Sequence, residues 1–396
     1  MKKRKGDGMA VPEDEAADLL RRMLSFRSVS GADGHREQRR FLDFLLDWLG
    51  TLPGYSLLHY QGCESGQHPF AHVRIDGQPS PAGRVLFACH LDVVPIGMED
   101  MWAHDPWGTD GEKDGRYFGR GSCDMKGPIV SLCLALRSLA SHGIGAEILF
   151  TSDEESGSAG AESQIDYLRG IERPAGIIVC APTEGRIRLG HRGAYWIEVT
   201  ATGKAAHGST PELGVSAIYR LMDCIALCRE GQGPKLRSDP FLGKESWNLG
   251  VVRAGGESPN LVPDRATGII DYRIVSDDVD DITDWWEGQE GISQVTRHLL
   301  LSPVSTDRSD PWLGKLSGPV DSEPCFCYTD ASIITKALPG IPIVIWGPGE
   351  SSEMHTIDES IGIPAICHMA ERYAQSLVDA CAPEGCRETP EPADIQ

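Results

Sequence analysis

Residues 128–155 read PIVSLCLALRSLASHGIGAEILFTSDEE, and this stretch decides the fold. It opens with Pro128, continues with closely spaced apolar residues and reaches Gly143. Proline suits the start of a helix and glycine its end, so a helix is predicted over 128–142. The short apolar run at 146–151 predicts a buried strand that leads directly into an acidic segment. Helix, turn and strand in this order are the unit of a sheet covered by helices.

The same alternation continues on both sides of this stretch. Helices are predicted over 10–27, 37–49, 159–168, 331–338 and 363–380, and strands over 71–75, 84–89, 176–180 and 341–346. Strands that alternate with helices predict an α/β fold, in which helices cover both faces of a mostly parallel sheet.

The pattern changes near Leu189. Strands are predicted there over 194–202, 247–253 and 265–274, and helices over 213–228 and 280–287. We expect a smaller α+β domain over 189–303, inserted into a main domain formed by 9–188 and 304–381. The last segment, 382–396, is rich in proline and glutamate and is expected to be disordered, because it can bury little apolar surface.

The composition excludes several classes of function. Hydrophobic residues make up 40% of the chain and charged residues 24%, which is typical of a globular protein. No apolar run approaches the roughly 20 residues that a membrane helix needs, and the basic N-terminus lacks the apolar stretch of a secretory signal. The net charge of -21 argues against nucleic acid and anionic membranes as partners. Twelve cysteines without a ribbon or disulfide spacing favour reduced thiols in a cytoplasmic protein.

Acidic and histidine residues follow the ends of the predicted strands. They are His90 and Asp92, the pair Glu154 and Glu155, Glu184, and His355, while Asp124 stands in a glycine-rich turn before the helix at 128–142. In an open α/β sheet, sites form outside the carboxyl ends of the strands, so these side chains are expected to converge. Two imidazoles and two carboxylates, from His90, Asp124, Glu155 and His355, would be ligands suited to zinc, cobalt or manganese.

Two neighbours of these ligands have a predicted role in the same site. Asp92 lies two residues after His90 on an extended segment, so it can orient the imidazole. Glu154 and Glu155 are adjacent and point in different directions, so one can bind metal while the other acts as general base. Alone, a His-x-Asp pair is usually incidental and an acidic pair can be a solvated helix start. The occurrence of all these histidine and acidic residues at successive strand ends favours a metal-dependent enzyme.

At these residues the sequence closely resembles the two-zinc amidohydrolases, which include acetylornithine deacetylase, succinyl-diaminopimelate desuccinylase, aminoacylase and carboxypeptidase G. The resemblance runs from about 17 to 380. It is carried by HLDVVP at 90–95, YFGRGSCDMKG at 117–127, TSDEE at 151–155, GKAAHG at 203–208, NLVPD at 260–264, DYR at 271–273, GPG at 347–349 and HTIDE at 355–359. It implies a catalytic main domain, a lid or dimerisation insert, and hydrolysis of an amide bond in a small N-acyl amino acid or dipeptide-like substrate.

The resemblance also implies a role for each matched metal ligand. His90 would bind a first metal ion, Asp124 would bridge two ions, and Glu155 and His355 would bind the second. Glu154 would deprotonate the metal-bound water and return the proton to the leaving amine, because metal binding lowers the pKa of water towards neutrality.

Three residues of the inserted domain are implied in substrate binding. In dimeric members the histidine that matches His207 reaches the site of the partner subunit and stabilises the tetrahedral oxyanion. Arg273 and Asn260 match positions that hold a substrate carboxylate, a task suited to a guanidinium fork. The simpler interpretations are that His207 is a surface histidine and that Arg273 pairs with Asp271 or Asp264.

One position departs from the family pattern. The family usually has Glu or Asp directly before Pro182-Thr183, where it completes the first metal site, and here that residue is Ala181. A methyl group cannot coordinate metal. The first site would keep only His90 and Asp124 from the protein, short of the three protein ligands typical of catalytic zinc.

Three interpretations of this change stay open. Glu184 or water could complete a weakened first site, or the enzyme could use a single metal held by Asp124, Glu155 and His355. The change could also mark amide formation or acyl transfer in a biosynthetic pathway, or a non-catalytic relative. Because Glu154 and the second-site ligands are intact, we favour hydrolysis with one or two zinc ions per chain, replaceable by cobalt or manganese. We also expect a homodimer and a substrate with a free carboxylate.

Overall fold

The computed structural model describes residues 11–80, 82–255 and 258–378, and the predicted tail at 382–396 lies outside them. The chain divides into two compact units. Unit 1 comprises Met1–Leu189, Thr306–Asp321 and Ala337–Gln396, and unit 2 comprises Gly190–Ser305 and Ser322–Lys336. The segment 322–336, placed in the main domain by the sequence, therefore groups with unit 2. Among the described residues, no helix has both the length and the apolar character to span a membrane.

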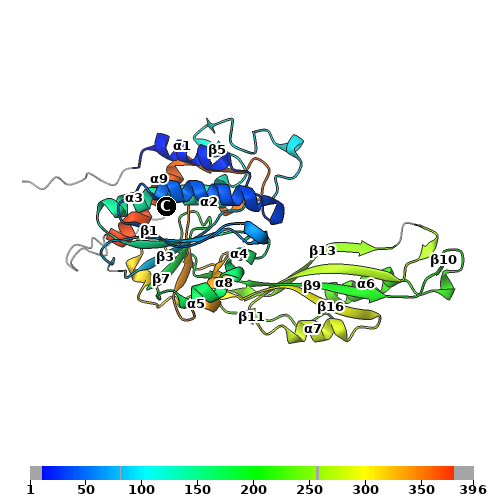
Figure 1. Cartoon of the computed structure of the whole chain (residues 1–396). Helices are drawn as coiled ribbons and strands as arrows, with labels where there is room; N and C mark the ends of the chain where they lie inside the picture. The colour runs from blue at the N-terminus through cyan, green and yellow to red at the C-terminus, as the bar shows by residue number, and fades with distance from the viewer. Residues whose placement is uncertain (1–10, 81, 256–257, 379–396) are drawn as a thin grey trace, which may run out of the picture. The chain divides into compact units, whose positions relative to one another are not determined.

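Unit 1 is an α/β domain, as predicted (Figure 1). Its helices are α1 (Glu13–Leu24), α2 (His35–Leu49), α3 (Gly127–Ser141), α4 (Ala159–Ser163), α5 (Ile165–Gly170) and α9 (Ile363–Val378). The central sheet contains β1 (Tyr55–Gln61), β2 (Phe70–Ile75), β3 (Val85–His90), β6 (Ala146–Thr151), β7 (Gly176–Val179) and β18 (Ile343–Ile345). A small second sheet contains β4 (Glu112–Lys113), β5 (Arg116–Phe118) and β19 (Ser360–Gly362).

The strand order of the central sheet is β1-β2-β6-β3-β7-β18. β3 pairs in parallel with β6 and β7, and β18 with β7, whereas β1 and β2 run antiparallel at one edge. From β3 the chain passes to β6 on one side and then to β7 on the other. Such a reversal opens a crevice at the carboxyl end of the central strand, where α/β sheets bind ligands. His90 is the last residue of β3 and lies at this point.

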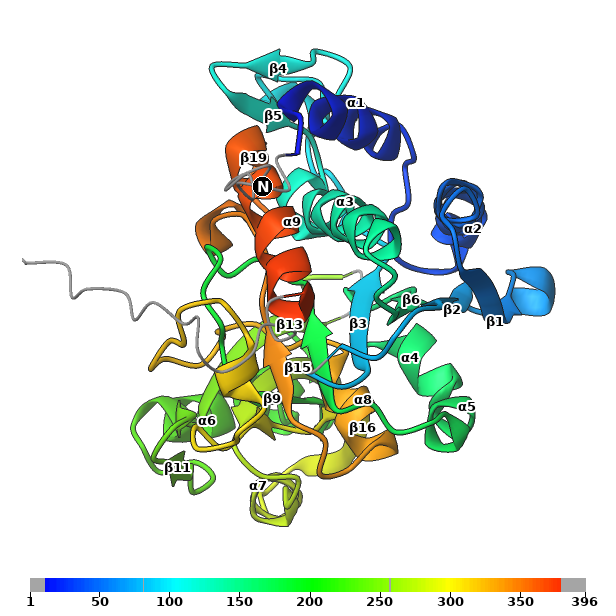
Figure 2. The ribbon, with the colours of Figure 1, turned by 90° about the vertical axis from the view of Figure 1, so that its left-hand side faces the viewer.

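Helices cover both faces of this sheet. α1, α3 and α9 pack against one another on one face, and α4 and α5 lie on the other (Figures 1 and 2). α3 is apolar on nearly all sides, which is typical of a helix enclosed by other elements. The single helix predicted over 159–168 is instead two short helices, because the backbone leaves the helical region at Gln164 (φ -107°).

Unit 2 is built on a four-stranded antiparallel sheet with the order β13-β15-β9-β16. These strands are β9 (Gly193–Thr202), β13 (Ser246–Ala254), β15 (Arg265–Ile274) and β16 (Ile292–Leu301). Its helices are α6 (Ala217–Arg229), α7 (Asp280–Glu287) and α8 (Ala331–Ala337). Short strands are β8 (Gly190–His191), β10 (Ala206–His207), β11 (Ser238–Asp239), β12 (Gly243–Lys244), β14 (Leu261–Val262) and β17 (Val304–Ser305). β15 alternates buried and half-exposed residues because one face of the sheet packs against α6 and α7.

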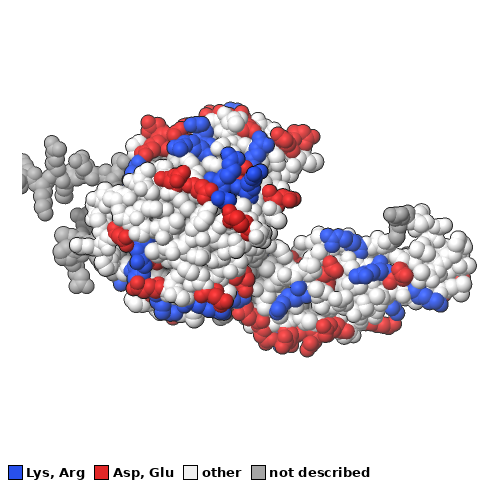
Figure 3. Space-filling model, viewed as in Figure 1, with Lys and Arg blue, Asp and Glu red and all other residues white. Residues whose placement is uncertain are grey.

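The surface carries both signs of charge. Figure 3 shows basic and acidic side chains interspersed over the visible face of unit 1. Acidic side chains gather over α7 of unit 2, whose exposed carboxylates belong to Asp280, Asp281, Asp284 and Glu287. Part of the net negative charge therefore lies on a helix face in contact with solvent.

Candidate metal centre

The four predicted metal ligands come together in unit 1. His90 ends β3, Glu155 follows β6, Asp124 precedes α3 and His355 follows β18. Nitrogen and oxygen atoms of His90, Asp124 and Glu155 all lie within 4.8 Å of one another. His90, Asp124 and the side chain of Glu155 are buried, whereas His355 keeps about half of its side chain exposed. Solvent therefore reaches the group from the His355 side.

Asp124 lies between the two histidines. Its Oδ1 is 3.1 Å from His90 Nε2, and its Oδ2 is 3.6 Å from His355 Nε2. His355 Nε2 also lies 3.0 Å from Glu155 Oε1. The Asp124 carboxylate therefore presents a different oxygen to each imidazole.

The charges of this group fit a divalent cation. Burial and the negative charge of Asp124 raise the pKa of Glu155 to about 7. Hydrogen bonds to Asp124 and Glu155 raise the pKa of His355 to about 10. Burial opposes a charge on His90, but the hydrogen bond to Asp124 prevails and raises its pKa well above the usual value. A divalent cation would offset the crowding of carboxylates that raises the pKa of Glu155, and two imidazoles with two carboxylates suit zinc, cobalt or manganese.

Asp92 fixes the turn that carries the two glutamates. Its Oδ1 accepts the backbone N–H of Glu154, its Oδ2 accepts that of Glu155, both at 3.1 Å, and Ser30 donates its hydroxyl to Oδ2. His90 Nδ1 lies 3.0 Å from the Asp92 carbonyl oxygen and 3.7 Å from the Asp92 carboxylate. The backbone of Asp92 thus contacts the imidazole, while its side chain sets the direction of Glu154 and Glu155.

Glu359 holds the glycine-rich turn from the other side. Its carboxylate accepts the backbone N–H groups of Gly121, Cys123 and Asp124, and Arg120 donates to it at 2.6 Å. Gly121 is required here, since it has φ 84° and a Cβ would come within 2.6 Å of a valine methyl. The sequence alone did not predict a role for Glu359. The available signal was its place as the acidic last residue of the matched stretch HTIDE.

The predicted substrate residues belong to unit 2. His207 pairs with Leu261 across β10 and β14, and Gly208 donates its backbone N–H to the Asn260 carbonyl, so His207 and Asn260 are neighbours. The Ser209 backbone N–H donates to His207 Nδ1 at 3.1 Å. A neutral His207 then carries its proton on Nε2, which makes that nitrogen a donor.

Arg273 is located on β15 and has contacts of its own. Its guanidinium lies 3.1 Å from the Asp271 carboxylate and over the ring of Tyr328, 5.2 Å from the centroid. The pairing with Asp271 expected as the simpler interpretation is therefore present. A substrate carboxylate at Arg273 would share the guanidinium with Asp271.

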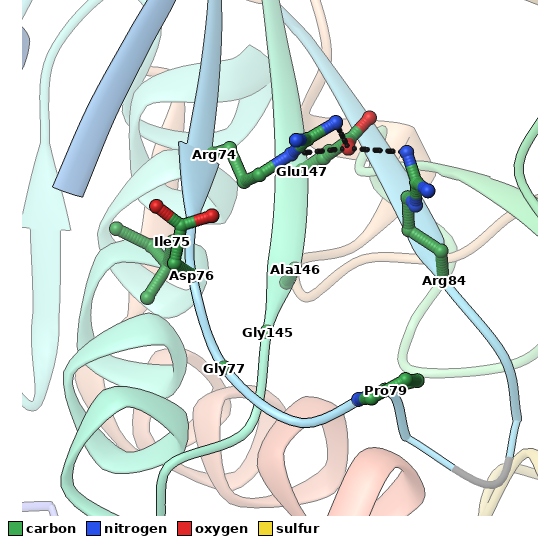
Figure 4. A pocket seen from close by; sticks show the side chains of 9 residues that line it. All are labelled: Arg74, Ile75, Asp76, Gly77, Pro79, Arg84, Gly145, Ala146 and Glu147. Atoms are coloured by element: carbon green, nitrogen blue, oxygen red, sulfur yellow. Dashed lines mark hydrogen bonds and ion pairs between the residues drawn. The ribbon is translucent and has the colours of Figure 1, made fainter. Parts of the chain in front are cut away.

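Another pocket lies at the opposite end of the central sheet (Figure 4). Arg74 and Arg84 line it and point toward the buried carboxylate of Glu147, which they contact at 2.7 and 3.0 Å. Arg84 also pairs with Glu172. Because carboxylates already neutralise both guanidinium groups, this pocket is a structural ion-pair network at the amino end of β6 and lacks the features of an anion site.

Comparison with known proteins decides the family. The model of "Peptidase family M20/M25/M40" matches residues 86–379. The chain belongs to this family. It is 27% identical to aminoacylase-1 of Sus scrofa over 92% of this chain and 95% of that protein. It is 28% identical to the protein named "Probable succinyl-diaminopimelate desuccinylase" of Staphylococcus epidermidis, over 69% of this chain and 77% of that protein.

Solved M20 structures share the fold. The M20 family metallo-carboxypeptidase Sso-CP2 from Sulfolobus solfataricus has a TM-score of 0.74 at 18% identity, and the match covers 92% of this chain and 98% of that one. The family resemblance and the mostly parallel α/β fold expected from the sequence are therefore confirmed, and so is the assignment to the M20 hydrolases.

In this M20 chain, Ala181 follows β7, the strand next to the one that ends with the predicted ligand His90. β3 pairs in parallel with β7, with Ala88 opposite Val179, so Ala181 leaves the sheet two residues after β7 at the same edge at which β3 ends with His90. Ala181 is buried, so its methyl group offers the crevice no ligand atom.

Glu184 is directed elsewhere in the structure. Its carboxylate accepts the backbone N–H of Ser351 at 2.7 Å and lies 3.6 Å from the guanidinium of Arg188. Glu184 is not part of the group formed by His90, Asp124 and Glu155 among the described residues. Recruitment of Glu184 as a substitute ligand would require the loss of both contacts.

Proposed function

We propose that this chain hydrolyses the amide bond of a small N-acyl amino acid or dipeptide-like substrate. The observation that carries the proposal is the placement of Asp124 between His90 and His355, with Glu155 in the same group and Glu154 beside it on one fixed turn. The names of the M20 relatives, an aminoacylase, a desuccinylase and an acetylornithine deacetylase, support this substrate class.

Each ligand has a defined part in the proposed reaction. A divalent cation held by His90, Asp124, Glu155 and His355 would supply Lewis-acid polarisation of the scissile carbonyl and of water. Glu154 takes the proton of the attacking water and returns it to the leaving amine. Asp92 keeps Glu154 in position through the backbone N–H that it accepts.

Residues of unit 2 would bind the substrate. The Nε2–H of His207 would donate to the oxyanion, and the hydrogen bond from Ser209 to Nδ1 supports this tautomer. Arg273 and Asn260 would hold a free carboxylate of the substrate. The guanidinium of Arg273 keeps donors beyond those that contact Asp271, since it has five N–H groups.

A substrate screen tests the reaction type. The full chain is incubated with zinc, cobalt or manganese and with N-acetyl amino acids, N-succinyl amino acids and dipeptides, and release of free amine is measured. We expect turnover of at least one of these classes that depends on added metal. Bound metal without any turnover would contradict hydrolysis and would favour the amide-forming or acyl-transfer alternative, whereas a chain that binds no metal would point to a non-catalytic relative.

Replacement of Ala181 by glutamate tests the asymmetry of the proposed centre. We expect the natural chain to hold one metal firmly, at Asp124, Glu155 and His355, and a second one weakly, because His90 and Asp124 alone offer two protein ligands. Ala181→Glu adds the missing ligand, so the weaker affinity should rise by at least about 10- to 100-fold, because even residues that only hydrogen-bond to metal ligands change the affinity on this scale. Isothermal titration with zinc measures the change.

The reaction of the Ala181→Glu variant separates two interpretations. Higher metal content with the same substrate and product would show that Ala181 only lowers affinity. A new reaction in the variant would show that Ala181 alters the chemistry. Ala181→Ser, which adds a hydroxyl but no carboxylate, is the matched control and should leave the metal affinity nearly unchanged.

We also propose that two copies associate through unit 2. β13 is an edge strand of its sheet, and Tyr219 and Met222 of the neighbouring α6 are 71% and 61% exposed, with Val252 of β13 54% exposed. An exposed apolar edge of this kind is usually covered by another protein surface. Sedimentation should give the mass of a dimer, and Met222→Lys with Val252→Lys should shift it to a monomer. A natural chain that sediments as a monomer at micromolar concentration would refute this assembly.

A further inference from the structure

A second group of metal-ligating side chains lies outside the proposed catalytic centre. It is formed by His35 at the start of α2, His68 in the loop before β2, and Asp153 after β6. His35 Nε2 is 2.5 Å and His68 Nδ1 is 2.6 Å from the same carboxylate oxygen, Asp153 Oδ2. The three ligand atoms lie within 4.8 Å of one another.

Hydrogen bonds to one oxygen hold the Asp153 carboxylate, and its other oxygen contacts the imidazoles. The backbone N–H of Gly31 donates to Oδ1 at 2.7 Å, and the Gln38 amide donates to the same oxygen at 3.2 Å. Among the contacts described for Asp153, those of Oδ2 are with the two histidines. Supporting hydrogen bonds of this kind orient carboxylates that bind metal.

This carboxylate is also a buried charge that lacks a permanent cation. Its side chain is 2% exposed, and the hydrogen bonds and ion pairs described for it involve neither lysine nor arginine. A buried carboxylate needs a positive partner. Either an imidazolium or a metal ion bound to neutral imidazoles can supply that charge here.

We propose that His35, His68 and Asp153 form a second metal site, which takes zinc or a similar divalent cation. Two imidazoles and one carboxylate leave a fourth position open, as in three-ligand zinc sites. The distances of 2.5 and 2.6 Å are those of hydrogen bonds. Tetrahedral zinc bonds of about 2.0–2.2 Å hold ligand atoms roughly 3.3–3.6 Å apart, so the rings must withdraw by about 1 Å.

His68 makes this adjustment feasible. It belongs to a loop and its side chain is 28% exposed, which provides both room to move and a path for the ion. His35 and Asp153 are fixed by α2 and by the end of β6. A metal at this site would join α2, the loop before β2 and the turn that carries Glu154 and Glu155. It would stabilise unit 1, and its presence does not depend on the proposed function.

The number of zinc ions per chain tests the site directly. In a full-length chain with Asp124→Asn and Glu155→Gln, the proposed catalytic centre loses two carboxylate ligands. Equilibrium dialysis followed by metal analysis should still find about one zinc per chain. The addition of His68→Asn should reduce this to less than about 0.1. His59→Asn is the matched control, because His59 is a half-buried histidine of β1 that contacts Gln164 and not Asp153; it should keep the zinc.

Two further measurements guard against misfolding. His68→Asn in the otherwise natural chain should lower the zinc content by one ion per chain. Added zinc should raise the thermal unfolding midpoint of the Asp124→Asn/Glu155→Gln chain. It should not raise the midpoint of the same chain with His68→Asn. Circular dichroism checks that each variant is folded, and His68→Gln replaces His68→Asn if it is not. Absence of zinc from the folded Asp124→Asn/Glu155→Gln chain, or unchanged zinc after loss of His68, would show a purely hydrogen-bonded cluster and overturn the proposal.

Discussion

Glu154→Gln should reduce amide hydrolysis about 10²- to 10⁴-fold while the chain keeps its metal. General acid–base catalysis by one positioned side chain contributes a factor of this size. A glutamine has nearly the same shape, and its backbone N–H can still donate to Asp92 as Glu154 does at 3.1 Å. The amide, however, cannot accept the proton of the attacking water. Initial rates on the best substrate of the screen, together with metal analysis of the same sample, measure the effect.

The neighbouring residues provide the controls. Glu155→Gln should lower the metal content and the rate together, because Glu155 belongs to the ligand group. Glu162→Gln changes an exposed glutamate of α4 and should leave both unchanged. If Glu154→Gln retained activity within about tenfold, the general base would be another group. If Glu154→Gln lost its metal, Glu154 would be a ligand.

The central elements of the fold were predictable because their burial shows in the sequence. β3, β6 and β7 consist of apolar residues with few interruptions, and all their residues are buried. The strands β1 and β16 were not predicted from the sequence. Both are edge strands of their sheets, and polar residues interrupt their apolar patterns. An edge strand has one free side, so packing constrains its sequence less.

The meeting of the proposed metal ligands was predictable from their positions after strands, whereas the contacts of the residues around them were not. His90 and Glu155 follow strands that end at the same edge of the sheet, so their meeting follows from the topology. Asp153 has a backbone φ of 54°, and its carboxylate meets His35 of α2 and His68 of the loop before β2. His35 begins α2 and His68 precedes β2, so neither follows the carboxyl end of a strand, and the rule that brought the other group together gave no signal for them. Such partners become visible once the elements are packed.

Glu359→Ala should lower the free energy of unfolding by about 3–5 kcal/mol. Glu359 and Arg120 are both nearly inaccessible, at 1% and 3% exposure, and the guanidinium donates to the carboxylate at 2.6 Å. Loss of one partner leaves the other charge buried and unpaired, which carries a cost of this size. The backbone N–H groups of Gly121, Cys123 and Asp124 lose their acceptor as well. Urea denaturation of the metal-free chain measures the change.

A double-mutant cycle shows whether the pair is the cause. Arg120→Met alone should also destabilise the chain, and the double variant should be more stable than the sum of the two effects predicts, because neither charge is then left alone. Glu350→Ala is the matched control. Glu350 pairs with Arg116 at the surface, where an ion pair contributes about 0–1 kcal/mol. Additive effects at Glu359 and Arg120, or a loss below 1 kcal/mol for Glu359→Ala, would mean that other contacts hold the turn that presents Asp124.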